Sequence, residues 1–108
     1  MTRGEQRTVQ ELVRRLAEAV QPERIILFGS HARGDAGPDS DVDLLVIAPS
    51  ELPPWQRTPP LYRLLAGAGL PKDLLWYTPE EVAEWQGVRT HFLTRVLREG
   101  QVVYEKAS

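Results

Sequence analysis

The feature that most constrains the fold is a short polar segment between two apolar runs. Arg24–Phe28 and Val42–Ile47 have the apolar composition that is typical of strands. The pair Gly29-Ser30 follows the first run, and only residues 31–40, rich in Gly, Asp and Pro, separate it from the aspartate that precedes the second. A parallel pair of strands needs a longer crossover. We therefore predict an antiparallel pair, which brings the Gly-Ser turn beside the start of the second strand.

Three aspartates are predicted to meet beside this turn. Asp41 and Asp43 are two residues apart, so the alternation of side chains along a strand places both on one face. Residues 48–72 are long enough for a parallel crossover that contains its own helix. That crossover would set Asp73, which opens an apolar run over residues 73–77, beside the other two.

Capping patterns and apolar spacing predict the remaining elements. Thr8 and Glu11 form a capping box for a first helix, which ends before Pro22. Thr78 and Glu81 form a second capping box, with a proline at the first helical position. The other expected elements are a helical segment of about two turns within residues 31–40, an irregular proline-rich loop over 49–60, helices over 61–68 and 88–99, and a strand over 102–104. This order predicts a two-layer α/β (α+β) domain with a mixed sheet.

Composition narrows the class of protein. The chain of 108 residues is expected to form one domain, residues 1–108, and its lack of cysteine excludes disulfides and thiolate metal sites. The first residues do not resemble a signal peptide, and no apolar stretch is long enough to span a membrane. We therefore expect a cytoplasmic protein with no membrane contact. A net charge of −2 gives no general attraction to nucleic acid, so nucleic-acid binding is not expected.

The side chains that are predicted to converge favour metal-assisted phosphate chemistry. Adjacent carboxylates repel one another, and a divalent cation resolves that conflict. Mg²⁺ takes one or two protein carboxylates and completes its octahedron with waters and substrate phosphates. Gly29 would let a phosphate approach the backbone, and Ser30 would add a hydroxyl donor. The combination predicts phosphoryl or nucleotidyl transfer by in-line displacement, with Asp41 and Asp43 as metal ligands.

Several side chains allow two interpretations. Asp73 is either a third catalytic carboxylate or simply the residue that opens a strand. Arg33 either contacts phosphate or pairs with an acid such as Asp35. Trp55, in the proline-rich loop, either offers a surface to a partner or folds back onto the domain. The other prominent side chains are interpreted as structural: His31 in a turn, His91 half-exposed on a helix, and Trp76, Trp85 and Phe92 in the core.

These motifs resemble those of a known family. GSHARG at residues 29–34 followed by SDVDL at residues 40–44 is similar to the signature of the minimal nucleotidyltransferases of the DNA polymerase β superfamily. The likeness extends in particular to the small MNT proteins, the MntA-type antitoxins that are encoded beside HEPN-domain partners. Weaker similarities are the leading helix, the aspartate at position 73, the TPEE helix start at 78–81 and the closing Gly-x-Val-x-Tyr at 100–104.

The resemblance implies a polymerase-β-like nucleotidyltransferase fold and a role for each motif residue. The triphosphate of ATP would be held by Gly29 and Ser30, with Arg33 as a further contact. Asp41 and Asp43 would bind Mg²⁺. Asp73 would be the third carboxylate, which assists the metal and activates the attacking hydroxyl. One departure is His31, where many relatives have arginine, and it affects only a secondary contact to phosphate or partner.

The resemblance also implies an acceptor and a partner. In this family AMP can be transferred to a tyrosine of the HEPN ribonuclease toxin, which is thereby silenced, so the chain would act as the antitoxin in a hetero-oligomer. A second hypothesis is a non-catalytic, nucleotide-binding antitoxin subunit that neutralises its partner by occlusion. A third is transfer to a small molecule or an RNA end, and the acidic charge balance disfavours RNA.

Overall fold

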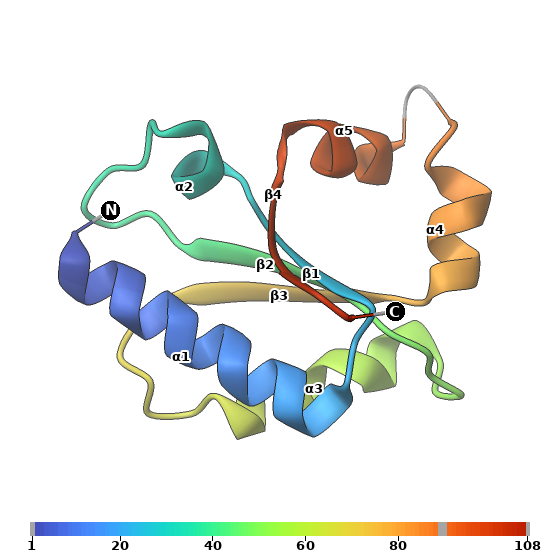
Figure 1. The fold of residues 1–108 in the computed structure, drawn as a ribbon, viewed down its shortest axis with the longest axis horizontal. Coiled ribbons are helices and arrows are strands. Elements are labelled where there is room, and N and C mark those ends of the chain that lie inside the picture. The colour runs from blue at the N-terminus through green and yellow to red at the C-terminus, as the bar shows by residue number, and fades with distance from the viewer. Residues whose placement is uncertain (1, 89–90, 108) are drawn as a thin grey trace.

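Four strands form a mixed sheet in the order β3-β2-β1-β4 (Figure 1). The computed structural model describes residues 2–88 and 91–107. The strands are β1 (Arg24–Phe28), β2 (Val42–Ile47), β3 (Lys72–Tyr77) and β4 (Gln101–Glu105). The helices are α1 (Arg3–Val20), α2 (Ser30–Arg33), α3 (Pro54–Leu64), α4 (Pro79–Trp85) and α5 (Phe92–Glu99). The predicted order of helices and strands is confirmed.

The strand pairing follows the prediction from loop lengths. β1 and β2 are antiparallel, with Phe28 opposite Asp43. β2 and β3 are parallel, with Asp43 opposite Asp73. β4 pairs antiparallel with the other side of β1, and its register shifts between Ile25 and Ile26. The predicted mixed sheet is therefore confirmed, and the ends of β1, β2 and β3 that carry the sequence motifs lie together.

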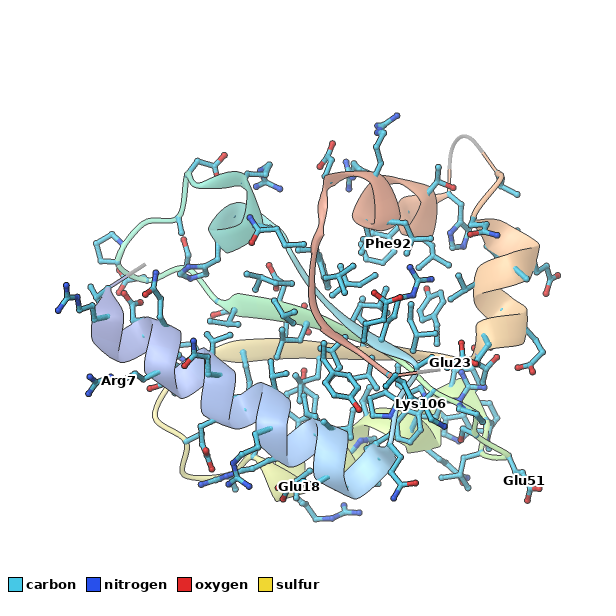
Figure 2. The ribbon with its side chains drawn as sticks, in the orientation of Figure 1. Arg7, Glu18, Glu23, Glu51, Phe92 and Lys106 are labelled. Carbon is cyan, nitrogen blue, oxygen red and sulfur yellow. The ribbon has the colours of Figure 1, made fainter. Side chains whose placement is uncertain are left out.

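Helices cover both faces of this sheet (Figure 1). Successive side chains of β2 point to opposite faces of the sheet, as expected for a strand. Val42, Leu44 and Val46 pack with α1 and α3, and this is the helix layer that the sequence predicts. Leu45 and Ile47 pack with buried side chains of α4 and α5, so these two short helices cover the second face of the sheet, where the predicted two-layer arrangement has no helices. Figure 2 shows charged side chains such as Arg7 and Glu18 projecting from the outer side of α1.

The first helix begins earlier than predicted. The helix starts at Arg3, and the capping box is made by Thr2 and Glu5 rather than by Thr8 and Glu11. The Thr8 hydroxyl instead donates to the Gly4 carbonyl oxygen at 3.0 Å, a bond that belongs to a helix interior. Residues 2–5 and residues 8–11 both match the capping-box pattern. The prediction chose the second because the apolar residues at helical spacing begin only after Thr8.

The prediction of an irregular loop over residues 49–60 is wrong for its second half. α3 starts at Pro54 and contains Pro59 and Pro60. Both prolines are exposed, whereas Arg57 and Leu61 are buried on the inner side of the helix. Burial of that inner side therefore outweighs the backbone hydrogen bonds that the prolines remove.

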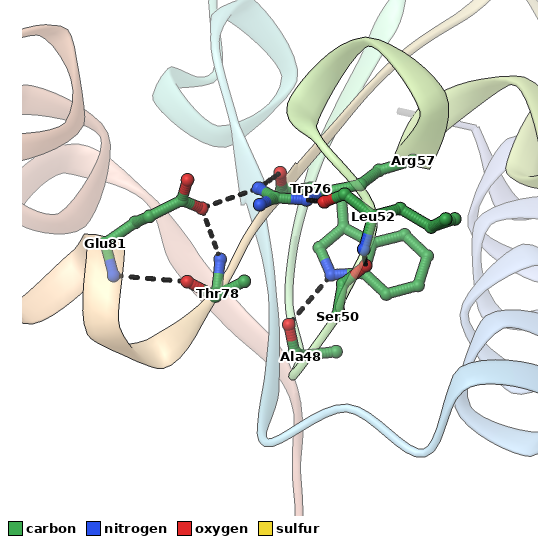
Figure 3. A network of polar contacts seen from close by, with 7 residues as sticks. All are labelled: Ala48, Ser50, Leu52, Arg57, Trp76, Thr78 and Glu81. Atoms are coloured by element: carbon green, nitrogen blue, oxygen red, sulfur yellow. Dashed lines mark hydrogen bonds and ion pairs between the residues drawn. The ribbon is translucent and has the colours of Figure 1, made fainter.

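Arg57 holds α3 against the end of β3 (Figure 3). Its side chain is 7% exposed and forms an ion pair with Glu81 at 2.6 Å. It also donates to the backbone oxygens of Leu52 at 2.9 Å and Trp76 at 3.4 Å. Glu81 in turn accepts the Thr78 N–H at 2.8 Å, which completes the predicted capping box of α4. One network therefore joins α3, β3 and α4.

Two other helix predictions need correction. α2 has a single turn where about two turns were expected. α5 begins at Phe92, with His91 as its N-cap rather than a residue within the helix, so the predicted start at residue 88 is wrong. Residues 89 and 90 lie outside the described part of the chain.

The aromatic predictions are confirmed in part. Trp76 packs on the core, and its indole N–H donates to the Ala48 oxygen at 2.8 Å. Trp85 and Phe92 are partly exposed instead of fully inside. Phe92 extends from α5 toward the sheet (Figure 2) and meets the Phe28 ring edge-on, with 5.8 Å between ring centroids. Trp55 is 74% exposed and does not fold back onto the domain.

Gly100 ends α5 at a close approach to β1. A Cβ atom at this position would lie 2.5 Å from Ile26 Cγ2 and 2.6 Å from the Val96 oxygen. We expect Gly100→Ala to lower the free energy of unfolding by about 1–3 kcal/mol, because the added methyl group overpacks this junction. Urea denaturation measures the change. Gly87→Ala is the matched control, since a Cβ there meets no atom within 4 Å. Equal stability of the two variants would contradict the prediction.

Within the described ranges, no helix combines the length and the apolar character that are needed to cross a bilayer.

Candidate active site

The three predicted carboxylates lie at neighbouring strand ends. Asp43 is on β2, Asp41 directly precedes that strand, and Asp73 is on β3 in register with Asp43. Asp43 is partly buried, whereas Asp41 and Asp73 are exposed. Burial, and then the negative charges of Asp73 and Asp41, raise the pKa of Asp43, and the nearby His31 and Arg33 partly offset this effect. The register thus sets Asp43 beside Asp73, as the sequence predicts, and Asp41 lies near enough to raise the pKa of Asp43.

Gly29 is packed directly against this carboxylate. Its φ of +75° is a conformation that other residues rarely adopt. A Cβ built there would overlap Asp43 Oδ2, so no larger residue fits without displacing the carboxylate. Gly29 is also the N-cap of α2, and the first N–H groups of a helix have no partner within it. The backbone at Gly29-Ser30 therefore presents donors beside an acidic group, which suits a phosphate that is shared with a metal ion.

His31 connects the α2 turn to the segment that leads into β2. Its Nε2 lies 3.2 Å from the Ser40 oxygen, a distance at which the ring N–H donates to the carbonyl. The other ring nitrogen, Nδ1, is buried and has no hydrogen-bond partner among the described residues. The interpretation as a structural residue of the turn agrees with this contact, since it holds the ends of the loop over residues 31–40 together.

Arg33 forms an ion pair with Asp35, which was one of the two roles predicted for it. The Nε–Oδ2 distance is 3.3 Å, and both side chains are about half exposed or more, at 49% and 63%. Exposed ion pairs of this kind are weak, about 0–1 kcal/mol. The pair therefore leaves Arg33 able to turn toward a phosphate, and the predicted contact to the triphosphate remains a prediction.

A pocket of about 490 Å³ opens beside the glycine turn. Gly29 and Arg33 line one side, and Phe92, Arg95 and Glu99 of α5 line another. Its volume falls within the range of small-molecule sites, about 300–1,000 Å³. The α5 residues were not predicted as part of the site. Helical spacing alone does not indicate which end of the strands a helix packs against.

Tyr62 is a second residue that sequence reasoning missed. Its hydroxyl donates to Asp73 Oδ1 at 3.2 Å and accepts the backbone N–H of Leu74 at 2.9 Å. Partial burial of this tyrosine, together with the negative charge of Asp73, raises the pKa of Tyr62 despite the hydrogen bond from the Leu74 N–H. Tyr62 lies within the helix that was predicted over residues 61–68, but helical spacing does not show which of its side chains reaches the strand that carries Asp73.

The donor set fits a divalent cation, although the side chains are not gathered around a common point. Among residues 2–88 and 91–107, no three His, Asp or Glu side chains are clustered closely enough to hold a metal ion as they lie. Asp41 and Asp73 are exposed, however, and both repel Asp43. A cation between them would relieve that repulsion, and an all-oxygen donor set is the one that Mg²⁺ prefers.

Two solved structures share this fold. One is a "putative nucleotidyltransferase" from Sulfolobus solfataricus, with a TM-score of 0.67 and 22% identity over 93% of this chain and 79% of that one. The other is a toxin-antitoxin crystal structure with AMP-PNP, with a TM-score of 0.61 and 20% identity over 90% of this chain and 73% of that one. The predicted fold class is confirmed by these likenesses.

Sequence comparison identifies the family. The "Putative protein adenylyltransferase MJ0141" of Methanocaldococcus jannaschii is 38% identical over 53 residues, which are 49% of this chain and 52% of that protein. The chain thus matches about half the length of this curated relative. The family model described as "Nucleotidyltransferase domain" matches residues 9–103. Since that match covers most of the sequence and all of the motif residues, the chain belongs to the nucleotidyltransferase domain family.

Proposed function

We propose that this chain is a Mg²⁺-dependent nucleotidyltransferase that transfers AMP from ATP to a hydroxyl group of a partner protein. The observation that carries the proposal is the register of β2 and β3, which sets Asp43 beside Asp73 while Gly29 lies against Asp43. Groups that can bind a metal ion and groups that can bind a phosphate therefore share one edge of the sheet. That pairing is what an in-line displacement at phosphorus requires.

Each motif residue has a distinct role in the proposed reaction. The backbone at Gly29-Ser30 and the Ser30 hydroxyl hold the triphosphate. Asp41 and Asp43, with Asp73, would hold Mg²⁺, which when bound stabilises the charge on the phosphate oxygens as a Lewis acid. Asp73 accepts the proton of the attacking hydroxyl, and pyrophosphate leaves on the opposite side of the α-phosphorus.

We further propose that the acceptor is a tyrosine of a HEPN ribonuclease toxin, so that the chain acts as an antitoxin within a cytoplasmic hetero-oligomer. Two comparisons support a protein acceptor: the curated relative is named as an adenylyltransferase of proteins, and a structural neighbour is a toxin-antitoxin complex with an ATP analogue. The exposed Trp55 supports contact with a partner, because a large aromatic on the surface commonly marks an interface.

The arrangement of the carboxylates favours one second candidate, a subunit that neutralises its partner by binding alone. As they lie, the three aspartates do not surround a metal position within the described part of the chain. A binding-only antitoxin would need the exposed surface around Trp55 and not the carboxylates. The two candidates therefore differ in whether Asp43→Asn still neutralises the partner.

Transfer of label from ATP into proteins of the host lysate tests the proposed function. With Mg²⁺ and ATP labelled at the α-phosphate, the wild-type chain should label a protein whose mass identifies the acceptor. Label at the γ-phosphate should not be transferred, since it leaves with pyrophosphate. The Asp41→Asn/Asp43→Asn double variant should transfer nothing. Absence of any labelled protein with the wild-type chain would overturn the proposal and favour the binding-only candidate.

Arg95 gives a prediction about the pocket beside Gly29. We expect Arg95→Gln to raise the KM for ATP about ten- to a hundredfold, because a charged hydrogen bond to phosphate contributes about 1.5–3 kcal/mol. Arg98→Gln is the matched control, since Arg98 is on the same helix but does not line this pocket. Calorimetric binding of AMP, which lacks the β- and γ-phosphates, should be unaffected. An equal loss for AMP and ATP would show that Arg95 contacts another part of the nucleotide.

A further inference from the structure

We propose that Tyr62 is a self-modification site, at which the chain transfers AMP from ATP to its own tyrosine hydroxyl. This inference rests on the proposed function, since it uses the same carboxylates and the same nucleotide. It differs in the acceptor, which is a residue of the chain itself. The consequence would be a transferase whose activity toward a partner is limited by its own modification.

The first argument is the contact between Tyr62 and Asp73. The tyrosine O–H donates to Asp73 Oδ1 at 3.2 Å. A nucleophile and its general base normally lie about 2.6–3.2 Å apart, and often further in a ligand-free site. Asp73 is the carboxylate to which the proposed reaction gives the proton of the acceptor hydroxyl. Tyr62 therefore already occupies the place, relative to this base, that an external hydroxyl would take.

The second argument is the backbone donor on the other side of the same oxygen. The Leu74 N–H donates to the Tyr62 oxygen at 2.9 Å. β3 is an edge strand, and β2 is its partner on one side, so this N–H points away from the sheet. A donor aimed at the phenol oxygen stabilises the negative charge that builds up as the proton leaves. The hydroxyl thus has an acceptor for its proton and a donor for its charge.

The third argument is access. The Tyr62 residue is 40% exposed, whereas the neighbouring Leu61 and Leu65, which anchor this part of the chain, are buried. The ring therefore stands at the surface edge of the domain, and attached AMP would not have to enter the core. The other tyrosines differ in position. Tyr77 lies at the opposite end of β3 from Asp73, and Tyr104 packs toward α1.

The proposed step balances as a group transfer. The Tyr62 oxygen attacks the α-phosphorus of ATP, and the bond between that phosphorus and the bridging oxygen of pyrophosphate breaks. The hydroxyl proton passes to Asp73, and pyrophosphate departs. The products are O-adenylyl-Tyr62 and pyrophosphate. The modified oxygen no longer carries a proton to donate to Asp73, and the attached nucleotide would occupy the approach to that carboxylate, so later transfer to a partner should be slowed.

The test is the mass of the purified chain after incubation with ATP and Mg²⁺. We expect the wild-type chain to gain one AMP, and peptide mapping should place it on Tyr62. Tyr104→Phe, the matched control, should gain the same group, whereas Tyr62→Phe and Asp43→Asn should gain none. The rate should not depend on protein concentration, because the contact lies within one chain.

Several outcomes would contradict the inference, and they distinguish it from the proposed function. Mapping of AMP to any residue other than Tyr62, or a rate that rises with protein concentration, would overturn the inference. An unmodified chain in a reaction that labels a lysate protein would overturn it while leaving the proposed function intact; absence of all labelling would count against both. Circular dichroism and the urea midpoint should be the same for Tyr62→Phe and wild type, which shows that the variant is folded. The location of AMP on the wild-type chain tests the inference even if a variant fails to fold.

Discussion

Asp43→Asn is expected to lower the rate of AMP transfer by about a thousandfold or more, with little change in fold. Asp43 is the carboxylate that both Asp73 and Asp41 repel, and it lies against Gly29. Its replacement by a neutral amide would remove a charge that is proposed to bind the cation, and a metal ion contributes several kcal/mol to the transition state of such a reaction. Transfer of α-phosphate label measures the rate, and circular dichroism verifies the fold.

When no metal ion is present, Asp43→Asn should be more stable than the wild-type chain at neutral pH. The pKa of Asp43 is raised in the folded chain, first by burial and then by Asp73 and Asp41, so ionisation of Asp43 disfavours folding. The wild-type chain should therefore lose stability relative to Asp43→Asn as the pH rises through that folded-state pKa. Below the ordinary carboxyl range the difference should vanish, because the protonated side chain resembles asparagine. Thermal melts in a chelator across this pH range measure it, and a wild-type chain more stable than the variant at neutral pH would contradict the prediction.

Arg57→Leu is expected to produce the largest loss of stability, about 2–3 kcal/mol. The variant removes an ion pair and two hydrogen bonds to backbone oxygens at a site where Arg57 is almost fully buried. Loss of one partner of a buried pair costs about 3–5 kcal/mol, and the 29% exposure of the Glu81 side chain lets water reduce that cost. Urea denaturation gives the free energy of unfolding.

Glu81→Gln is the control for this network. The amide oxygen can still accept the Thr78 N–H, so the cap of α4 should survive while the charge of the ion pair is lost. We therefore expect a smaller loss than for Arg57→Leu. Equal losses would show that the charge pair, rather than the hydrogen bonds of Arg57 to the Leu52 and Trp76 backbone, dominates the stability of this region.

Most of the carboxylate arrangement could be predicted because local rules determine it. The bounds of β1 and β2 follow from apolar runs that glycine, aspartate and proline interrupt. The ten residues between Ser30 and Asp41 allow only an antiparallel return, and the longer segment before Asp73 allows a parallel one. The meeting of Asp43 with Asp73 therefore required no knowledge of side-chain packing.

The parts of the site that could not be predicted depend on tertiary packing. Tyr62 fell within the helix predicted over residues 61–68, but only the packing of α3 against β3 brings its hydroxyl to Asp73. In the same way, Arg95 and Phe92 join the pocket beside Gly29 through the angle at which α5 packs, and helical spacing alone does not specify that angle.

The two ends of the parallel pair β2 and β3 carry different features, and this has an evolutionary consequence. The aspartates stand where these strands begin, whereas the network of Arg57 and Glu81 joins the chain where β3 ends (Figure 3). Substitutions at the two ends are separated by the length of the strands, so their effects on stability should be nearly additive. A lineage could therefore change its acceptor at one end, or lose catalysis there altogether, while the other end preserves a folded subunit on which selection can continue to act.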